Sequence, residues 1–282
     1  MMTETFRAAC VMGWPVKQSR SPLIHGYWLK QHGLRGDYRR EAVRPEDFPD
    51  FLAHLAERGY VGGNVTMPHK DMALMLSEPD ERALAVGAAN TLWLENGTLK
   101  STNTDVEGFI GALDESAPGW DQGLQKAVVI GAGGAARAVV YGFIERGVPR
   151  IHVVNRTLSK AEALRERFGP SVVPTSFDDL RGALEGAGLV ANATSLGIEG
   201  FPDLQLDLSP MRADAVAADA IYVPLETSLL KTARARGMRT SDGLGMLLHQ
   251  AGRGFELWFG LRPKVTTELR ALVEAELLKK QS

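Results

Sequence analysis

A glycine-rich turn is the segment whose residue types and spacing most directly predict chemistry. Gly131, Gly133 and Ala136 fit the pattern G-x-G-x-x-[G/A] after an apolar run and at the start of a helix-like run, "VVIGAGGAARAVV". Gly131 permits a tight turn, Gly133 lets the backbone approach a pyrophosphate, and Ala136 allows close helix–strand packing. The helix N-terminus adds partial positive charge. The pattern therefore predicts a dinucleotide-binding loop formed by Gly131, Ala132, Gly133, Gly134 and Ala135.

The end of the next apolar run indicates which dinucleotide binds. Asn155 follows Gly131 by about 24 residues, where such domains place the group that faces the adenosine ribose. An enzyme that uses NAD normally has Asp or Glu there. Asn155, Arg156 and Thr157 instead offer donors and a guanidinium, which suit a 2′-phosphate. We therefore expect NADP; the alternative is an arginine that simply lies in solvent.

The elements that must position these residues follow from the alternation of short apolar runs with amphipathic segments, which is typical of βαβ units. In the N-terminal part we expect helices from Ser21-Pro22, with Ser21 as N-cap, and over 45–59. Strands are expected there over 7–13, 37–43, 61–66 and 90–97, and later over 126–133, 150–157, 171–176, 188–195 and 215–222. The sequence predicts an α/β fold with mainly parallel sheets.

An amphipathic helix is expected near the C-terminus, after the nucleotide unit is complete. Its apolar positions recur at helical spacing and comprise Leu244, Leu247, Leu248, Ala251, Phe255, Trp258 and Phe259. So wide an apolar stripe needs a partner, so we expect this helix and a final one over 266–280 to return to the first domain. The predicted division is a substrate-binding catalytic domain over 1–108, a Rossmann-like NADP-binding domain over 109–241, and C-terminal helices over 242–282.

Composition narrows the class of partner. The 282 residues carry a net charge of −2 and a pI near 6.3, which argues against a dedicated nucleic-acid or membrane-surface binder. Cys10 is the only cysteine, so neither a disulfide framework nor a cysteine-based zinc site is possible, and the histidines show no metal-ligand spacing. We find no secretory signal or membrane span. We therefore expect a cytoplasmic protein with a small-molecule substrate and no metal.

Several segments, in order along the chain, together resemble shikimate dehydrogenases, which reduce 3-dehydroshikimate to shikimate with NADPH in aromatic amino-acid biosynthesis. The segments are "SRSP" (19–22), "NVTMPHK" (64–70), "AAN" (88–90), "NTD" (103–105), "GAGGAAR" (131–137), "NRT" (155–157), "NATSLG" (192–197), "IYVPLET" (221–227) and "DGLGMLLHQA" (242–251). As a set they are specific, and they cover nearly the whole chain.

The resemblance implies that Lys70 and Asp105 face each other across the substrate pocket. A hydride passes between nicotinamide C4 and a ring carbon, and a proton must reach or leave the oxygen on that carbon. Lys70 is expected to be the general acid/base, and Asp105 to orient it and contact a substrate hydroxyl. Lysine suits this role if partial desolvation lowers its pKa while a carboxylate holds it. His69 is adjacent but is expected to point away.

The resemblance also implies the remaining contacts. Substrate contacts are expected from Ser19, Ser21, Thr66, Asn90, Tyr222 and Gln250, with the two serine hydroxyls near the substrate carboxylate beside a helix N-terminus. Cofactor contacts are expected from Thr194, Ser195, Leu196, Ile221, Gly243 and Met246. Of these, Met246 is expected near the nicotinamide, and Gly243 at a hinge where a side chain would obstruct the cofactor.

Two other functions stay open at this point. A quinate or dual quinate/shikimate dehydrogenase that uses NAD would differ around Ser19, Ser21 and Thr66. A non-catalytic nucleotide sensor would have no reason to retain both Lys70 and Asp105. The sequence does not decide between a monomer and a homodimer.

Overall fold

The chain forms two compact units in a computed structural model that describes residues 6–279. Unit 1 contains the chain up to Thr104 and again from Gln250, and unit 2 contains Asp105–His249. The chain passes between the units at 104/105 and 249/250, whereas the sequence-based limits were 108 and 241. Unit 2 is thus one continuous segment inserted into unit 1.

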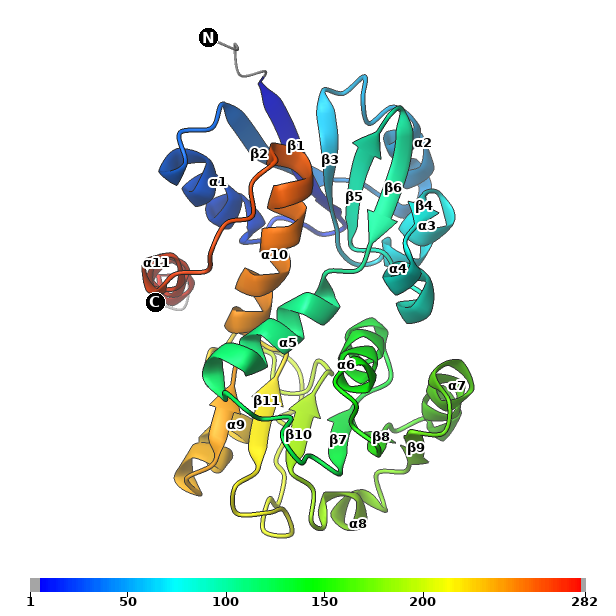
Figure 1. Ribbon diagram of the computed structural model, residues 1–282, viewed down its shortest axis with the longest axis vertical. Helices are drawn as coiled ribbons and strands as arrows, with labels where there is room; N and C mark the ends of the chain where they lie inside the picture. The colour runs from blue at the N-terminus through cyan, green and yellow to red at the C-terminus, as the bar shows by residue number, and fades with distance from the viewer. Residues whose placement is uncertain (1–5, 280–282) are drawn as a thin grey trace. The chain divides into compact units, whose positions relative to one another are not determined.

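Unit 1 is built on a six-stranded mixed sheet with strand order β2-β1-β3-β5-β6-β4 (Figure 1). Strands β2, β1 and β3, at one side of the sheet, run parallel, while β5 is antiparallel to both β3 and β6. The strands are β1 (Arg7–Gly13), β2 (Gly36–Ala42), β3 (Tyr60–Val65), β4 (Glu78–Pro79), β5 (Thr91–Glu95) and β6 (Thr98–Thr102). The helices are α1 (Ser21–Gln31), the 3-10 helix η1 (Pro45–Asp47), α2 (Phe48–Ala53), α3 (Lys70–Met75), α4 (Glu81–Val86) and α11 (Thr267–Leu278).

Besides the unpredicted α3, α4 and β4, local structure in unit 1 differs from the prediction at three places. The helix predicted over 45–59 stops at Ala53, where His54 leaves helical geometry (φ −106°, ψ 18°), and turns over 54–59 lead into β3. Strand β6 was not predicted, although Asn96 and Gly97, both with positive φ, form the tight turn that pairs it with β5.

The N-cap predicted at Ser21 is the third difference. Helix α1 begins at Ser21 itself, and Arg20 occupies the cap position without a side-chain hydrogen bond. The Ser19 hydroxyl accepts from Ser21 N–H at 3.3 Å instead. The serine two residues earlier thus satisfies one of the free donors at this helix start.

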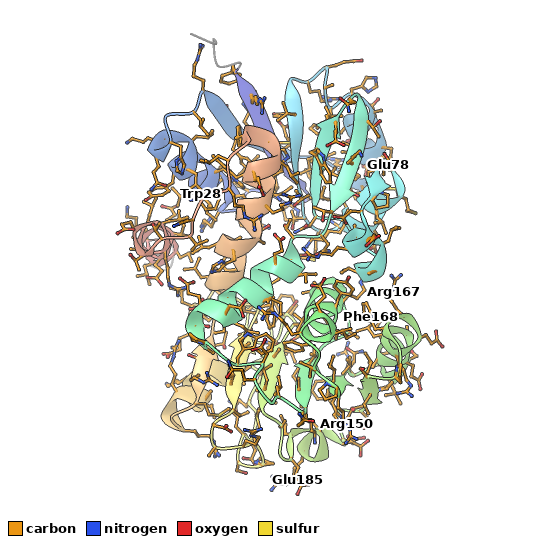
Figure 2. All side chains as sticks on the ribbon, viewed as in Figure 1. Trp28, Glu78, Arg150, Arg167, Phe168 and Glu185 are labelled. Atoms are coloured by element: carbon orange, nitrogen blue, oxygen red, sulfur yellow. The ribbon has the colours of Figure 1, made fainter. Side chains whose placement is uncertain are left out.

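The C-terminal segment packs on the sheet of unit 1, which confirms that prediction. Helix α10 (Gly243–Phe259) enters unit 1 at Gln250, and Trp258 Nε1 donates to Leu92 O of β5 at 2.8 Å. A Cβ at Gly62 would lie 2.4 Å from Trp258 Nε1, so this position must be glycine. Trp28 of α1, labelled in Figure 2, is fully buried and donates to Lys264 O, which joins α1 to the segment before α11.

Unit 2 contains a six-stranded parallel sheet with strand order β12-β11-β10-β7-β8-β9. Chain order reverses between β7 and β10, and ligands of such sheets bind at the carboxyl ends beside this point. The strands are β7 (Ala127–Ile130), β8 (Ile151–Val154), β9 (Val172–Thr175), β10 (Leu189–Asn192), β11 (Val216–Asp219) and β12 (Arg239–Ser241). The helices are α5 (Asp105–Ser116), α6 (Gly134–Glu145), α7 (Leu158–Phe168), α8 (Leu180–Leu184), α9 (Ser228–Ala235) and the start of α10.

Two apolar clusters cover the faces of this sheet, with Val129 and Val128 on opposite sides. Because both faces of the sheet are covered, nearly every strand residue is buried, which explains why the strands appear in the sequence as short apolar runs. The predicted α/β class with a Rossmann-like second domain is therefore confirmed. No helix within residues 6–279 is long and apolar enough to cross a membrane.

Candidate active site

Three of the singled-out segments converge in unit 1 at the carboxyl end of β3. Val65 N donates to Asn90 O at 2.8 Å, and Ala89 N donates to Lys70 O at 3.0 Å. The Asn103 side chain donates to Ala88 O at 3.0 Å. Segments 64–70, 88–90 and 103–104 thus form one connected structure, although they are far apart in the sequence.

Lys70 is the first residue of α3 and is half-buried. The preceding residue, His69, is buried, with its Nε2 2.8 Å from Val43 O and its ring stacked on Phe48 at 4.2 Å between centroids. These contacts occupy the imidazole away from any ligand. His69 therefore fixes the turn that presents Lys70.

The orientation of the Asn90 amide is set by a backbone group. Thr104 N–H, which can only donate, lies 2.7 Å from Asn90 Oδ1, so the amide nitrogen is the end available as donor. Thr104 Oγ1 lies 3.3 Å from Gln250 Oε1 within the same unit. Asn90 Nδ2 in turn lies 3.1 Å from Thr104 Oγ1, so hydrogen bonds to Thr104 hold both amides in place.

A chain of buried polar side chains supports these two amides and was not predicted. Tyr38 Oη donates to Asn64 Oδ1 at 2.6 Å, and Asn64 Nδ2 donates to Thr91 Oγ1 at 3.1 Å. Thr91 Oγ1 in turn lies 3.1 Å from Thr104 Oγ1. Burial raises the pKa of the Tyr38 hydroxyl well above its usual value, so it stays protonated as a donor. Polar residues at the inner ends of strands were the only sequence signal for this network.

The other predicted substrate residues of unit 1 lie at the ends of neighbouring elements. Ser19 and Ser21 hydroxyls are 3.2 Å apart at the N-terminus of α1, and Arg40 donates to Ser19 O at 2.7 Å. Thr66, directly after β3, is half-buried and donates its N–H to Met12 O. The two adjacent hydroxyls at a helix N-terminus provide donors suited to a carboxylate.

Asp105, the remaining predicted catalytic residue, directly follows Thr104 and begins α5. Its side chain is 8% exposed. A carboxylate in the first turn of a helix is stabilised by the partial positive charge of the free N–H groups there.

The glycine-rich loop of unit 2 has the space that a dinucleotide needs. Gly131 has φ 110°, and a Cβ there would come within 2.8 Å of Thr194 Cγ2. Gly133, the N-cap of α6, is exposed, and a Cβ there would meet no atom within 4 Å. Ala136 is fully buried against the sheet. The loop therefore leaves open backbone at the helix N-terminus, which fits a pyrophosphate.

The predicted ribose-side residues follow the neighbouring strand. Gly131 N donates to Val154 O at 2.8 Å, which places the end of β8 beside the glycine loop. Asn155 Nδ2 donates to Thr157 O at 2.8 Å, and this bond shapes the turn into α7. Arg156 is exposed at that turn. Its guanidinium is accessible to a phosphate on the ribose, so these residues fit NADP.

The other predicted cofactor residues also lie at the carboxyl edge of the sheet in unit 2. Thr194, Ser195 and Leu196 follow β10, and Ile221 and Tyr222 follow β11. Met246 packs partly buried against the core of unit 2.

Gly243 is required by a neighbouring backbone segment. Its N–H donates to Ile221 O at 3.1 Å, and a Cβ would lie 2.4 Å from Ala220 O. The glycine thus lies inside unit 2, six residues before the chain passes back into unit 1, and a side chain would collide first with this protein backbone.

Gly243→Ala is therefore expected to destabilise the protein by about 2–3 kcal/mol, because the added methyl must displace a backbone carbonyl. Urea unfolding measures the loss. Gly182→Ala in α8 is the matched control, since a Cβ there meets nothing within 4 Å. Equal urea midpoints for the two variants would contradict the prediction.

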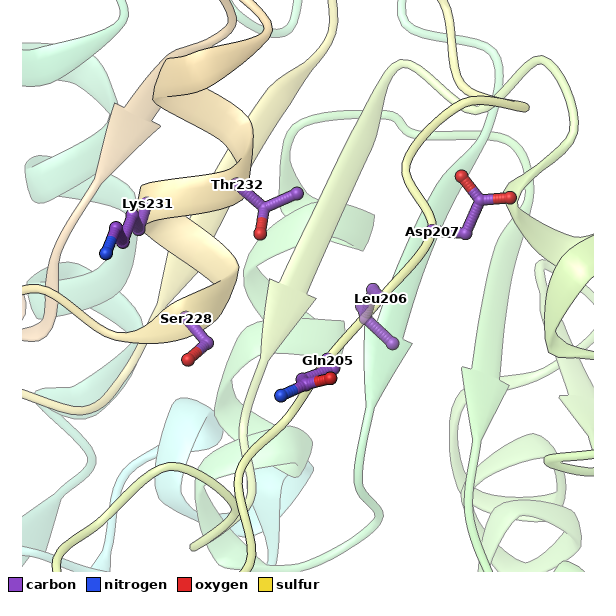
Figure 3. A pocket seen from close by; sticks show the side chains of 6 residues that line it. All are labelled: Gln205, Leu206, Asp207, Ser228, Lys231 and Thr232. Atoms are coloured by element: carbon purple, nitrogen blue, oxygen red, sulfur yellow. The ribbon is translucent and has the colours of Figure 1, made fainter.

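A separate pocket of about 400 Å³ opens on unit 2 between α9 and the segment after β10 (Figure 3). Its lining residues are Gln205, Leu206, Asp207, Ser228, Lys231 and Thr232. None of them is a predicted substrate or cofactor contact.

Comparison with protein families finds three matching models that together span most of the chain. They describe a shikimate dehydrogenase substrate binding domain (residues 11–92), a shikimate/quinate 5-dehydrogenase (118–197) and a shikimate 5′-dehydrogenase C-terminal domain (243–272). A curated protein of Rhodopseudomonas palustris named shikimate dehydrogenase (NADP(+)) is 63% identical over 279 residues, covering 99% of this chain and 100% of that protein.

Solved structures of a shikimate dehydrogenase and of a quinate dehydrogenase share this fold. Shikimate 5-dehydrogenase from Thermus thermophilus, in complex with NADP(H) and shikimate, is 34% identical with a TM-score of 0.81, covering 97% of this chain and 99% of that one. Quinate dehydrogenase from Corynebacterium glutamicum, in complex with NAD, is 32% identical with a TM-score of 0.87, covering 96% and 100%.

Proposed function

The chain belongs to the shikimate dehydrogenase family, and we propose that it interconverts 3-dehydroshikimate and shikimate with Lys70 as general acid/base and Asp105 as its partner. The observation that carries the activity is the 63% identity, over nearly the full length of both chains, to an NADP-dependent shikimate dehydrogenase. Identity to the NAD-bound quinate dehydrogenase is 32%, so the quinate alternative has less support.

NADP supplies the hydride acceptor or donor for this reaction when it is bound. In the reductive direction, the Lys70 ammonium donates a proton to the carbonyl oxygen of the substrate as that oxygen gains negative charge. In the oxidative direction, the neutral amine accepts the hydroxyl proton. Asp105 holds the Lys70 side chain in position and accepts from a substrate hydroxyl.

The remaining residues of unit 1 orient the substrate ring. The NH₂ groups of Asn90 and Gln250 donate to substrate oxygens, and hydrogen bonds to Thr104 hold both amides in orientation. Ser19 and Ser21 donate to the substrate carboxylate, and Thr66 donates to a neighbouring oxygen. Tyr222 of unit 2 contributes its hydroxyl near the carboxylate. Holding the substrate ring in the reactive orientation before the chemical step lowers the entropy cost of reaching the transition state.

The cofactor residues divide between the pyrophosphate and the ribose. The backbone of the 131–135 loop and the N-terminus of α6 hold the pyrophosphate. Asn155, Arg156 and Thr157 hold the 2′-phosphate, while 194–196, Ile221, Gly243 and Met246 enclose the nicotinamide side. Cys10 is buried and unpaired, which suits the reducing cytoplasm that we propose as the location.

The test of this function is the absorbance of reduced nicotinamide with purified protein. We expect turnover with shikimate and NADP⁺ to exceed turnover with quinate and NAD⁺ by at least about tenfold in kcat/KM. Turnover of quinate with NAD⁺ alone would reassign substrate and cofactor. Binding of NADP⁺ without turnover of either acid would instead support the sensor.

Arg156→Ala is expected to raise the KM for NADP⁺ by about 10–100-fold, because charge-assisted hydrogen bonds to the 2′-phosphate are lost. The KM for NAD⁺ should stay within about twofold, since that cofactor lacks the phosphate. Arg150→Ala is the matched control, because Arg150 (Figure 2) directly precedes β8 and so lies at its opposite end. A parallel rise in both KM values would mean that Arg156 does not read the phosphate.

A further inference from the structure

Two buried polar residues end adjacent strands in unit 2. Asn192 is the last residue of β10 and Asp219 the last of β11, and they are register partners in the parallel pair. Their exposures are 0% and 2%. Asn192 Nδ2 donates to Asp219 Oδ1 at 3.1 Å. A buried carboxylate costs stability unless hydrogen bonds satisfy it. The hydrogen bonds that Asn192 and Asp219 make therefore indicate what the two side chains do.

Asn192 holds the loop that follows its own strand. Its Oδ1 accepts from Thr194 N at 3.1 Å and from Thr194 Oγ1 at 2.7 Å, and its Nδ2 also donates to Leu196 O at 3.0 Å. The Thr194 hydroxyl in turn accepts from Leu196 N at 3.0 Å. The amide cannot rotate without breaking these bonds, so its orientation is fixed.

Asp219 holds the loop that follows the neighbouring strand. Its Oδ1 accepts from Ile221 N at 3.0 Å, and its Oδ2 accepts from Thr227 Oγ1 at 2.7 Å. Thr227 is the N-cap of α9 and accepts from Leu230 N. One carboxylate therefore links the start of the 220–227 loop to its end.

We propose that Asp219 is a positioning residue of the active site, whose carboxylate joins the 194–196 loop to the 220–227 loop and sets both against the bound ligands. This role rests on the proposed function, in which 194–196, Ile221 and Tyr222 contact cofactor or substrate. The residue was absent from the predicted site because it precedes those contacts and lies in an apolar strand.

The carboxylate, rather than its amide, is what the geometry requires. Ile221 N–H, the Asn192 amide and the Thr227 hydroxyl all donate to it, so both oxygens must accept. An asparagine at 219 would place two hydrogens where one of these donors now points. These three facing groups are neutral, so no counter-charge compensates the carboxylate there.

Burial also changes the titration of Asp219. Burial raises its pKa to about 6 from the ordinary 3.8, against smaller opposing contributions from its hydrogen bonds. A raised folded-state pKa means that folding favours the protonated form, so this group's contribution to stability is lost as pH rises through 6. The ionised carboxylate is thus retained at neutral pH at a cost in stability, which its three hydrogen bonds offset in part.

The test is Asp219→Asn in the full-length enzyme, assayed at pH 8. The KM for NADP⁺ is expected to rise about tenfold while kcat changes less than about threefold, because one donor–acceptor bond of the brace is lost and the proton-transfer residue is untouched. The thermal midpoint should change little, because removal of the buried charge offsets the lost hydrogen bond. Asp207→Asn is the matched control: that carboxylate also accepts from Arg181 and from Ser209 N but is exposed, so its KM should match the parent.

A second pair of variants keeps the test informative if Asp219→Asn folds poorly. Thr227→Val removes the hydroxyl that donates to Asp219 and should raise the same KM, whereas Thr227→Ser should restore it. Ser195 is the exposed residue of the 194–196 loop, so Ser195→Asp places a charge there and should raise the KM for NADP⁺ directly.

The outcomes distinguish the positioning role of Asp219 from the proposed cofactor contact of the 194–196 loop. If Ser195→Asp raises the KM but Asp219→Asn and Thr227→Val leave it within twofold, the positioning role is wrong and the cofactor loop stands. If Ser195→Asp also has no effect, the proposed cofactor contact at this loop fails. A fall in the thermal midpoint with no change in KM would reduce Asp219 to a structural residue.

Discussion

Replacing Lys70 with alanine is expected to lower kcat for shikimate oxidation by about 10³-fold while the KM for NADP⁺ stays near that of the parent. A positioned general acid/base contributes about 10²–10⁴-fold, and alanine leaves no group to exchange the proton. The loss should appear in kcat because the proton moves only in the transition state. Reduced-nicotinamide absorbance gives kcat, and fluorescence titration gives cofactor affinity.

A surface lysine provides the comparison for this test. Lys100→Ala is the matched control, because Lys100 is in the same unit and pairs on the surface with Glu95 at 2.9 Å. Retention of more than about a tenth of the parental kcat in Lys70→Ala would remove Lys70 from the chemical step.

Asp105→Asn is expected to lower kcat/KM for shikimate by about 10²-fold, the second largest effect. Asparagine keeps the shape of the side chain but not the charge that holds an ammonium group, and it offers a donor where the substrate hydroxyl needs an acceptor. Steady-state kinetics with shikimate varied at saturating NADP⁺ measure the change.

The double variant decides whether the two residues act together. Residues that form one catalytic unit lose activity non-additively, so Lys70→Ala/Asp105→Asn should be scarcely slower than Lys70→Ala alone. Asp114→Asn serves as control, since Asp114 lies on α5 as well but is bonded to Trp120 Nε1. Multiplication of the two single losses in the double variant would show that Asp105 acts independently of Lys70.

The features predicted best from the sequence are those that a local residue pattern determines. The strands of the nucleotide-binding unit read as short apolar runs because both faces of a parallel sheet are buried, and the glycine loop is read from backbone requirements at single positions. The C-terminal helix was predicted to return to the first domain because its apolar stripe had no partner in the completed nucleotide unit. Gly62 and Trp258 show where that stripe is used.

The missed residues are those whose roles depend on pairings between distant segments. Tyr38, Asn64 and Thr91 come from separate strands, and only sheet register aligns them beneath Asn90. Asp219 likewise gains its partners from β10 and from the start of α9. The prediction of Ser21 as N-cap was wrong because the Ser19 hydroxyl accepts the hydrogen bond at this helix start instead. Sequence spacing does not distinguish two such neighbouring caps.

The insertion of one unit within the other has a consequence for synthesis on the ribosome. Residues 105–249 emerge as an unbroken stretch and can fold as soon as they are free, whereas the unit begun first is also the one finished last. Until Trp258 emerges, Leu92 O lacks its indole donor and the space above Gly62 is unfilled. A nascent chain of which only residues up to His249 have emerged therefore carries a whole nucleotide-binding unit joined to a substrate-binding unit that still lacks the rest of α10 and α11.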